Sequence, residues 1–150
     1  MTAERKVLVD SKDLKIIEML LANSRISFTD IAKEIGITDV AVRKRVARLE
    51  KRGIIRRYTV LVNPKALGYN SISLTGIDTA PENLFRILDF LKSKSYAKKI
   101  YLTSGDHMIM VEIWARDCDE MRAILKEIEG LDGVQRICPA VISDVIKEEI

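Results

Sequence analysis

Apolar side chains in the first third of the chain recur at helical spacing in three places, each preceded by a residue that caps helices. The first pattern follows Asp10, fades near Asn23 and has its apolar stripe at Leu14, Ile17, Leu20 and Leu21. The second pattern follows Ser27, ends at Gly36 and has its stripe at Ile31, Ala32 and Ile35. The sequence therefore predicts two amphipathic helices, the second of them short.

The third apolar pattern belongs to a longer helix that Thr38 caps and Gly53 ends. Its apolar side chains follow an i, i+4, i+7 spacing at Val42, Val46 and Leu49. This stripe should face the two preceding helices. Two helices joined by a glycine-containing turn indicate a helix-turn-helix, here over residues 27–52. The alternation over residues 54–62 predicts a strand or hairpin arm, which makes the domain winged.

Periodicity in the second half switches between strand and helix, and a β-α-β pattern occurs twice. The predicted strands are residues 71–78, 99–103, 107–115 and 134–142. The predicted helices start at Pro81 and Asp117, and their stripes have identical spacing, at Leu84, Ile87, Leu88 and Leu91 and at Met121, Ile124, Leu125 and Ile128. This order predicts a ferredoxin-like, ACT-like βαββαβ fold with four antiparallel strands and two helices on one face.

These patterns predict an α+β chain with two domains. A winged helix-turn-helix domain covers residues 1–62, a linker that Asn63-Pro64 opens covers 63–70, and a ferredoxin-like effector and oligomerisation domain covers 71–150. Charge changes near the same place. The first 65 residues hold 15 basic and 8 acidic side chains, a net charge of +7, whereas the remainder has a net charge of −4. We expect a basic binding module joined to a domain that does not bind polyanions.

The predicted strand over residues 107–115 indicates that the second domain has a partner. Ile109, Val111 and Ile113 should face the helices. Met108, Met110 and Trp114 should point to the opposite face, where a two-layer fold has nothing to cover them. A face-to-face sheet dimer would bury these three side chains, and a tolerated exposed patch is the alternative.

Composition excludes several classes of protein. A hydrophobic content of 47% and a charged content of 31% are typical of a globular chain. There is no secretory leader and no apolar run of about 18 residues, so we expect a cytoplasmic protein without a membrane span. Cys118, Cys138 and His107 cannot form a four-ligand zinc site by themselves, and we expect reduced thiols, no metal and no cofactor. The absence of a nucleophile–base pair or phosphate loop argues against an enzyme.

Cationic side chains concentrate on the third predicted helix and just beyond it. Eight lysines and arginines lie between Arg43 and Arg57, against the single acid Glu50. This density exceeds that of an ordinary solvated helix face and favours DNA as the partner. The expected DNA-binding residues are Thr38, Asp39, Val40, Arg43, Lys44, Ala47, Arg48, Lys51, Arg56 and Arg57.

Different roles are expected within this set. The small side chains of Val40 and Ala47 should let the helix approach base edges and thymine methyl groups. Arg43, Lys44 and Arg48 are expected to contact bases or phosphates, and the expected phosphate contacts are Lys51, Arg56 and Arg57. Asp39 lies near the helix N-terminus, where we expect it chiefly to cap the helix, with a cytosine amine as the alternative partner.

Short motifs along nearly the whole chain occur in the same order in one known family. They are Asp13-Leu-Lys-Ile-Ile17, Ile31-Ala-Lys-Glu-Ile-Gly-Ile37, Val42-Arg-Lys-Arg-Val-Ala-Arg-Leu-Glu50, Gly53-Ile-Ile55, Asn63-Pro64 with Leu67-Gly68-Tyr69, Ser104-Gly105-Asp106 and Gly133-Val134. From about residue 10 onward the chain resembles the leucine-responsive regulatory protein/asparagine regulator (Lrp/AsnC) transcription factors, or feast/famine regulators, in their archaeal form.

The resemblance implies homodimers built through the C-terminal domains, which assemble further into tetramers or octamers. It also implies that small effectors, often amino acids, bind where the Gly-Asp turn meets the last strand of a neighbouring subunit. The residues at these positions are Thr103, Ser104, Gly105, Asp106, His107, Cys138 and Pro139.

One position departs from the family pattern. Effector-binding members commonly have a second aspartate two residues after the aspartate of the turn, where this chain has Met108. A thioether cannot pair with an ammonium group, which argues against a free amino acid as the ligand, while Asp106 and His107 remain polar contacts. A Gly-Asp hairpin turn without a ligand is the alternative. Considered on its own, His107 is expected to be a surface residue next to the turn rather than a ligand or an acid/base group.

Together these features predict a sequence-specific transcriptional regulator that binds double-stranded DNA. A dimer would place two third helices in successive major grooves about 34 Å apart and read a pseudo-palindromic operator. The resemblance implies repression, including that of its own promoter. The alternative is an architectural DNA-coating protein with little sequence preference. A third class, an enzyme or its regulatory subunit, rests only on the fact that ferredoxin-like domains also serve as amino-acid sensors.

Overall fold

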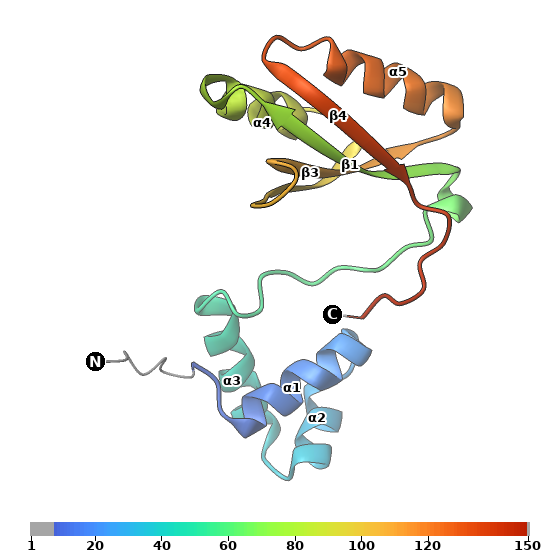
Figure 1. Ribbon diagram of the computed structural model, residues 1–150. Helices are drawn as coiled ribbons and strands as arrows, with labels where there is room; N and C mark the ends of the chain where they lie inside the picture. The colour runs from blue at the N-terminus through green and yellow to red at the C-terminus, as the bar shows by residue number, and fades with distance from the viewer. Residues whose placement is uncertain (1–7, 150) are drawn as a thin grey trace. The chain divides into compact units, whose positions relative to one another are not determined.

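The computed structural model describes residues 8–149. The chain divides between Leu61 and Val62 into two compact units, and each unit has a hydrophobic core of its own. Figure 1 shows the helical first unit and the second unit with its sheet. In the described range, every helix is too short or too polar to traverse a lipid bilayer.

The first unit consists of three helices. They are α1 (Ser11–Ala22), α2 (Phe28–Ile35) and α3 (Asp39–Lys51). Each begins at the expected cap, with the side chains of Asp10, Ser27 and Thr38 accepting hydrogen bonds from backbone N–H groups three residues later. Gly36 and Gly53 follow α2 and α3 in the left-handed region, at φ 77° and 70°. The predicted helix bounds are therefore confirmed.

The core of the first unit corrects the predicted stripe of α1. Leu14 and Leu21 are 50% and 53% exposed, whereas Ile16 and Asp13 are buried. The helix has apolar side chains on two sides, and its rotation is set by Asp13, whose carboxylate binds arginines of α3. The stripes predicted for α2 and α3 are confirmed, because the core cluster consists of Ile16, Ile31, Ala32, Val42 and Val46.

The strand or hairpin arm predicted over residues 54–62 is not formed. Residues 56–62 are exposed and belong to no strand, and their backbone groups make no backbone hydrogen bond within the described chain. The apolar side chains of this segment are exposed as well, with Val60 at 75% and Leu61 at 60%. A strand requires a neighbouring strand, and the described protomer provides none for this segment.

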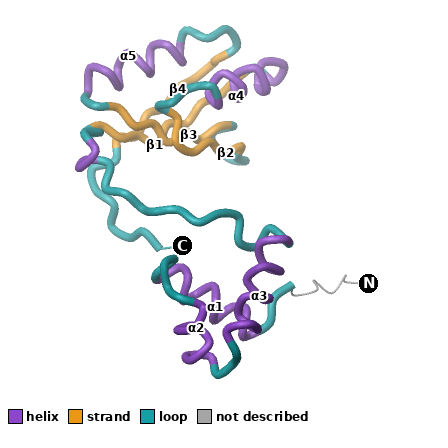
Figure 2. Tube along the Cα trace, turned by 180° about the vertical axis from the view of Figure 1, so that it is seen from behind, coloured by secondary structure: helices purple, strands orange, loops and turns teal. Residues whose placement is uncertain are grey.

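The second unit has the predicted ferredoxin-like topology. Its elements are β1 (Ser71–Thr79), α4 (Leu84–Lys92), β2 (Ala97–Leu102), β3 (Ile109–Ala115), α5 (Cys118–Glu129) and β4 (Val134–Val141), with short 3₁₀ turns at Lys65–Leu67 and Pro81–Asn83. The strands are antiparallel in the order β2-β3-β1-β4. Both helices cover the same face of the sheet, as the view from behind in Figure 2 also shows.

Strand β3 separates the covered face of the sheet from the open one. Ile109, Val111 and Ile113 are fully buried under the helices, as predicted. Met110 and Trp114 are half-buried on the opposite, open face. The prediction for Met108 is wrong: this residue lies in the turn before β3, where the alternation has not begun, and it packs against the buried core cluster.

Candidate functional site

The solvent side of α3 combines small and cationic side chains. The exposed residues include Val40, Arg43, Lys44, Ala47 and Lys51, beside the paired Arg48 and the acids Asp39 and Glu50, and the buried ones are Val42, Val46 and Leu49. Within residues 8–149, Arg43, Lys44 and Lys51 form no ion pair. A positive helix face of this kind suits a polyanion, and its small residues permit close approach.

The remaining residues expected at the DNA surface flank this face. Thr38 accepts a hydrogen bond from the Ala41 N–H at 3.1 Å, and the Asp39 carboxylate accepts one from the Val40 N–H at 2.9 Å. Both side chains therefore stabilise the start of α3. Arg56 and Arg57 are exposed in the extended segment that follows the helix.

Arg48 lies differently from the expectation that it contacts DNA. Its Nη2 is 3.1 Å from both carboxylate oxygens of Asp13, and Arg45 Nη1 lies 2.8 Å from the same carboxylate and 2.7 Å from that of Asp10. These contacts hold α1 against α3 and neutralise the two arginines within the unit. They also lower the pKa of Asp10, chiefly through its hydrogen bond with Arg45. Arg48 is also 43% exposed, so its contact with DNA stays a prediction beside this structural role.

The Gly-Asp turn between β2 and β3 is tied to the sheet by hydrogen bonds. The Thr103 hydroxyl donates to the His107 carbonyl at 2.6 Å, and Arg136 Nη2 on β4 donates to the Asp106 carbonyl at 2.7 Å. Gly105 has a φ of 120°, which favours glycine. Ser104 is exposed at the tip of the turn. The turn is therefore held at both of its ends.

Asp78 on β1 contacts both the end of the Gly-Asp turn and Arg136 on β4. It is absent from the predicted set of effector-binding residues. It accepts a hydrogen bond from Arg136 Nε at 2.7 Å and one from the Met108 N–H at 3.1 Å, and it lies 3.1 Å from His107 Nδ1. The hydrogen bond from Arg136 is the main reason why the pKa of Asp78 lies below its usual value. The strand register would have identified this residue, because Asp78 and Arg136 are paired across β1 and β4.

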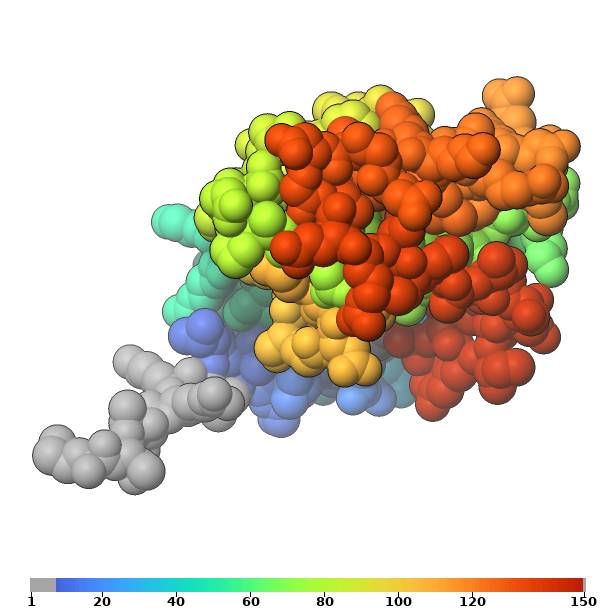
Figure 3. Space-filling view, turned by 45° about the horizontal axis from the view of Figure 1, so that its top comes forward, coloured from blue at the N-terminus to red at the C-terminus, as the bar shows by residue number. Residues whose placement is uncertain are grey.

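His107 is not the surface residue that the sequence predicts. Its side chain is only 19% exposed, and its ring lies against Gly76, where the Cβ of any larger residue would come within 2.3 Å of the imidazole. Cys138 and Pro139 on β4 are paired with Gly76 and Thr75. His107 therefore lies against Gly76, which is paired with the predicted β4 residue Cys138. Gly76 itself was not among the predicted site residues. Figure 3 shows the uncovered surface of β4, an edge strand of the sheet.

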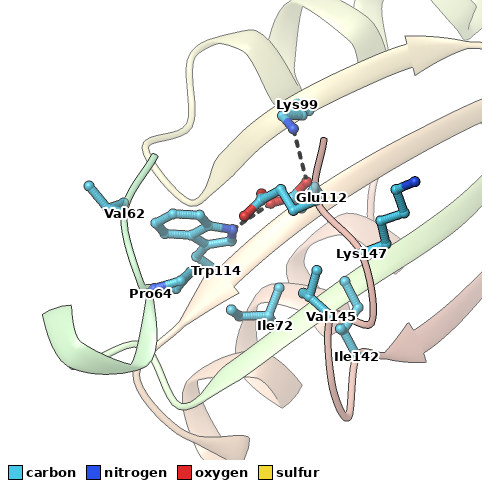
Figure 4. Close-up of a pocket in the computed structure, with 10 residues that line it drawn as sticks. Val62, Pro64, Ile72, Lys99, Glu112, Trp114, Ile142, Val145 and Lys147 are labelled. Atoms are coloured by element: carbon cyan, nitrogen blue, oxygen red, sulfur yellow. Dashed lines mark hydrogen bonds and ion pairs between the residues drawn. The ribbon is translucent and has the colours of Figure 1, made fainter. Parts of the chain in front are cut away.

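The open face of the sheet contains a cavity of about 240 Å³ at the other end of β3. Figure 4 shows its lining by Val62, Pro64, Ile72, Lys99, Glu112, Trp114, Ile142, Val145, Lys147 and Glu148. The Trp114 indole N–H donates to Glu112 at 2.7 Å, and Lys99 lies 3.9 Å from that carboxylate. The cavity therefore has both apolar and charged walls, and its Glu112 carboxylate is bound by Trp114 and Lys99. Within residues 8–149, no cluster of His, Cys, Asp and Glu is arranged to hold a metal ion.

Comparison with known proteins agrees with this arrangement. Residues 9–56 match the winged helix-turn-helix DNA-binding family model. The HTH-type transcriptional regulator LrpA of Pyrococcus horikoshii is 47% identical over 141 residues, which cover 93% of this chain and 100% of the relative. LrpA of Pyrococcus abyssi is 46% identical over the same share of each chain. The chain belongs to the Lrp/AsnC family of transcriptional regulators.

Solved structures of Lrp/AsnC proteins have the same fold. Escherichia coli AsnC matches with a TM-score of 0.89 at 26% identity, over 95% of this chain and 97% of AsnC. A transcriptional regulator of Neisseria meningitidis, solved as a complex with L-Met, matches with a TM-score of 0.87 over 94% of each chain. Its identity is 17%, so this second likeness shows the fold alone.

Membership of the Lrp/AsnC family confirms the predicted fold class and the predicted function. The protein is a DNA-binding transcriptional regulator with a helix-turn-helix domain and a ferredoxin-like domain. The relatives are regulators and not enzymes, as expected.

Proposed function

We propose that this Lrp/AsnC protein represses transcription, including that of its own gene, by binding a pseudo-palindromic operator as a homodimer. The observation that carries the proposal is the selective pairing on α3. Arg45 and Arg48 are bound to carboxylates, while Arg43, Lys44 and Lys51 have no such partner within residues 8–149. The unpaired cations share the solvent side of the helix with Val40 and Ala47, which leaves a face able to enter a major groove.

Two readouts separate base contacts from phosphate contacts on this face. Arg43, near the start of α3, is assigned to a guanine, and Lys51 at its end is assigned to phosphates, together with Arg56 and Arg57. Arg43→Ala should then weaken operator binding by about 1–3 kcal/mol and relax specificity at one base pair. Lys51→Ala should weaken binding to all duplexes alike.

The test is a binding titration at fixed, stated salt. Operator duplexes selected from a random pool by the wild-type protein are compared with unselected duplexes of the same length. A regulator binds the selected duplex at least about a thousandfold more tightly. Equal affinity for both duplexes would instead identify an architectural, DNA-coating protein.

The homodimer is proposed to form through the open face of the sheet. Met110, Trp114 and Ile72 lie on this face, Trp114 and Ile72 line its cavity, and no helix of the second unit covers these three residues. Packing two such faces together would bury apolar surface on both, at about 25 cal/mol per Å². Dimers of this type are proposed to assemble further into tetramers or octamers.

A small-molecule effector is proposed to bind at the Gly-Asp turn, next to β4 of a neighbouring subunit. The support is a turn of exposed backbone and hydroxyl groups, from Thr103 to Asp106, that is fastened to the sheet by Arg136. The regulator from Neisseria, which has the same fold, was solved with L-Met. In the present chain Asp78 is occupied by Arg136 and His107, so Asp106 is the carboxylate left for an ammonium group.

The effector proposal is tested by a thermal-shift screen of amino acids and related metabolites. A ligand that binds only the folded protein at 100 times its Kd stabilises it by about 2.7 kcal/mol. Asp106→Asn should abolish the shift caused by an amino acid, whereas a ligand whose shift survives this change binds elsewhere.

A DNA-binding regulator without a membrane-spanning helix in its described range is proposed to act in the cytoplasm.

A further inference from the structure

Phe28, the first residue of α2, lies against Arg43 on α3. The Arg43 Cζ is 5.3 Å from the centroid of the phenyl ring. This distance is inside the range of about 6 Å over which an aromatic face attracts a cation. The contact joins the two helices of the helix-turn-helix at the solvent side of α3, where Arg43 is exposed.

The phenyl ring is a fixed platform. Phe28 is partly buried and packs against the core cluster of the first unit. The start of α2 is held by Ser27, whose hydroxyl accepts a hydrogen bond from the Asp30 N–H at 3.0 Å and donates one to the Asp30 carboxylate at 2.6 Å. A ring packed in this way restricts the positions open to the arginine above it.

The other arginines of α3 are held by a different chemistry. Arg45 and Arg48 are bound by carboxylates, which occupy N–H donors and neutralise the charge. An aromatic face attracts the guanidinium and leaves its five in-plane N–H donors free. Arg43 is therefore the one arginine of this helix that, within residues 8–149, is both positioned and available.

We propose that Phe28 is a positioning residue for sequence readout. It holds the Arg43 guanidinium in place before DNA arrives, so that two N–H groups meet the N7 and O6 acceptors of one guanine. Holding the side chain in advance reduces the entropy lost on binding. This inference rests on the proposed base contact of Arg43, and it adds a residue that itself touches neither base nor phosphate.

The test compares Phe28→Leu with Phe28→Tyr in fluorescence-anisotropy titrations of the full-length protein. The probes are the operator duplex selected by the wild-type protein and duplexes in which each guanine is replaced in turn. Phe28→Leu removes the aromatic face and should weaken operator binding about two- to fivefold. The loss should be confined to the guanine that Arg43→Ala also identifies. Phe28→Tyr keeps the aromatic face and should retain wild-type affinity.

A double-mutant cycle distinguishes positioning from packing. In the Arg43→Ala background, Phe28→Leu should cause no further loss, because the side chain to be positioned is absent. Lys51→Ala, which removes an exposed cation of the same helix assigned to phosphates, is the matched control and should weaken all duplexes alike. If Phe28→Leu proves too unstable for titration, Phe28→Met fills a similar volume with a flexible side chain and takes its place.

Three outcomes overturn the inference. The first is a uniform loss for Phe28→Leu on all duplexes that persists in the Arg43→Ala background, which would mean packing alone. The second is tighter operator binding by Phe28→Leu, which would mean that the stack withholds Arg43 from DNA. The third is that Arg43→Ala no longer distinguishes the operator from the guanine-replaced duplexes, whereas Phe28→Leu distinguishes them as well as the wild type does. If Arg43→Ala itself leaves discrimination unchanged, the proposed base contact of Arg43 fails as well.

Discussion

The Asp13 carboxylate, 1% exposed, lies 2.8 Å from the guanidinium of Arg45 across the interface between α1 and α3. A carboxylate at such depth is tolerated only when it is paired and hydrogen-bonded. Asp13 meets both conditions, since it binds Arg45 and Arg48 and also accepts a hydrogen bond from the Asp10 N–H. The first unit thus uses one buried acid to hold α1 against α3, the helix that is proposed to contact DNA.

Asp13→Ala should destabilise the first unit by about 2–3 kcal/mol. This is less than the 3–5 kcal/mol typical of a fully buried pair, because both arginines reach solvent. Circular dichroism in urea measures the change. Glu18→Ala on the same helix is the control: it removes a surface pair with Lys15 at 3.4 Å and should cost under about 1 kcal/mol. Equal losses for the two variants would show that Asp13 does not orient α1.

Met110→Asp should dissociate the proposed homodimer into monomers. The substitution places a charge on the open face of the sheet, which dimerisation would have to bury without a partner. Sedimentation velocity at several concentrations measures the assembly. Phe85→Asp is the control, because Phe85 is 73% exposed on α4, on the helix-bearing side. If Phe85→Asp dissociates the oligomer and Met110→Asp does not, the subunits associate through the helices.

Asp78→Asn should lower stability at pH 6 by about 1.5–3 kcal/mol, the value of a hydrogen bond to a charged group. The pKa of Asp78 is lower in the folded state than in the unfolded chain, owing first to Arg136. Its stabilising contribution is therefore complete above the unfolded pKa and is lost as the pH falls through the folded pKa. Denaturation curves of the two proteins should converge below about pH 4.

The control for this pH dependence is Asp119→Asn. Asp119 pairs with Arg122 on the surface of α5 and is 88% exposed. The free energy of unfolding of Asp119→Asn should differ little from that of the wild type over the whole pH range. If the difference in the free energy of unfolding between wild type and Asp78→Asn is constant from pH 6 to pH 3, the assigned role of the Asp78 charge is contradicted.

Tyr58 should ionise only at strongly alkaline pH. The residue is 50% exposed, and partial burial, followed by the hydrogen bond that its hydroxyl donates to Glu50 at 2.7 Å, raises its pKa to about 12. Since the folded pKa lies above the unfolded one, the contribution to stability is complete below about pH 10 and is lost as the pH rises through the folded value. Ultraviolet titration should show a step that Tyr58→Phe removes. Glu50→Gln should move this step to lower pH, and a step that Glu50→Gln leaves unmoved would contradict the pairing.

Elements that depend on neighbouring residues in the chain could be predicted from the sequence. The caps Asp10, Ser27 and Thr38 act within one helical turn, so their positions gave correct starts for all three helices of the first unit. The stripes of α4 and α5 were equally informative, because most of their residues are buried against the sheet: Ile87, Leu88 and Leu91 on α4 and Met121, Ile124 and Ile128 on α5.

Features that depend on distant partners could not be predicted in the same way. The rotation of α1 follows from arginines 32 and 35 positions away, which helical periodicity cannot represent. The segment over residues 54–62 has the alternation of a strand but no strand beside it. The environment of His107 requires the register of β1 and β4, since its contacts are Asp78 and Gly76.

The contact between His107 and Gly76 has an evolutionary consequence. Any side chain at position 76 would occupy the volume that the imidazole fills, because the Cβ would lie 2.3 Å from a ring carbon. A larger residue at position 76 therefore requires a smaller residue at 107 or a displaced imidazole. A smaller residue at 107 with glycine kept at 76 would instead open a space beside the Gly-Asp turn that this protein has closed, and with it room for a bulkier metabolite.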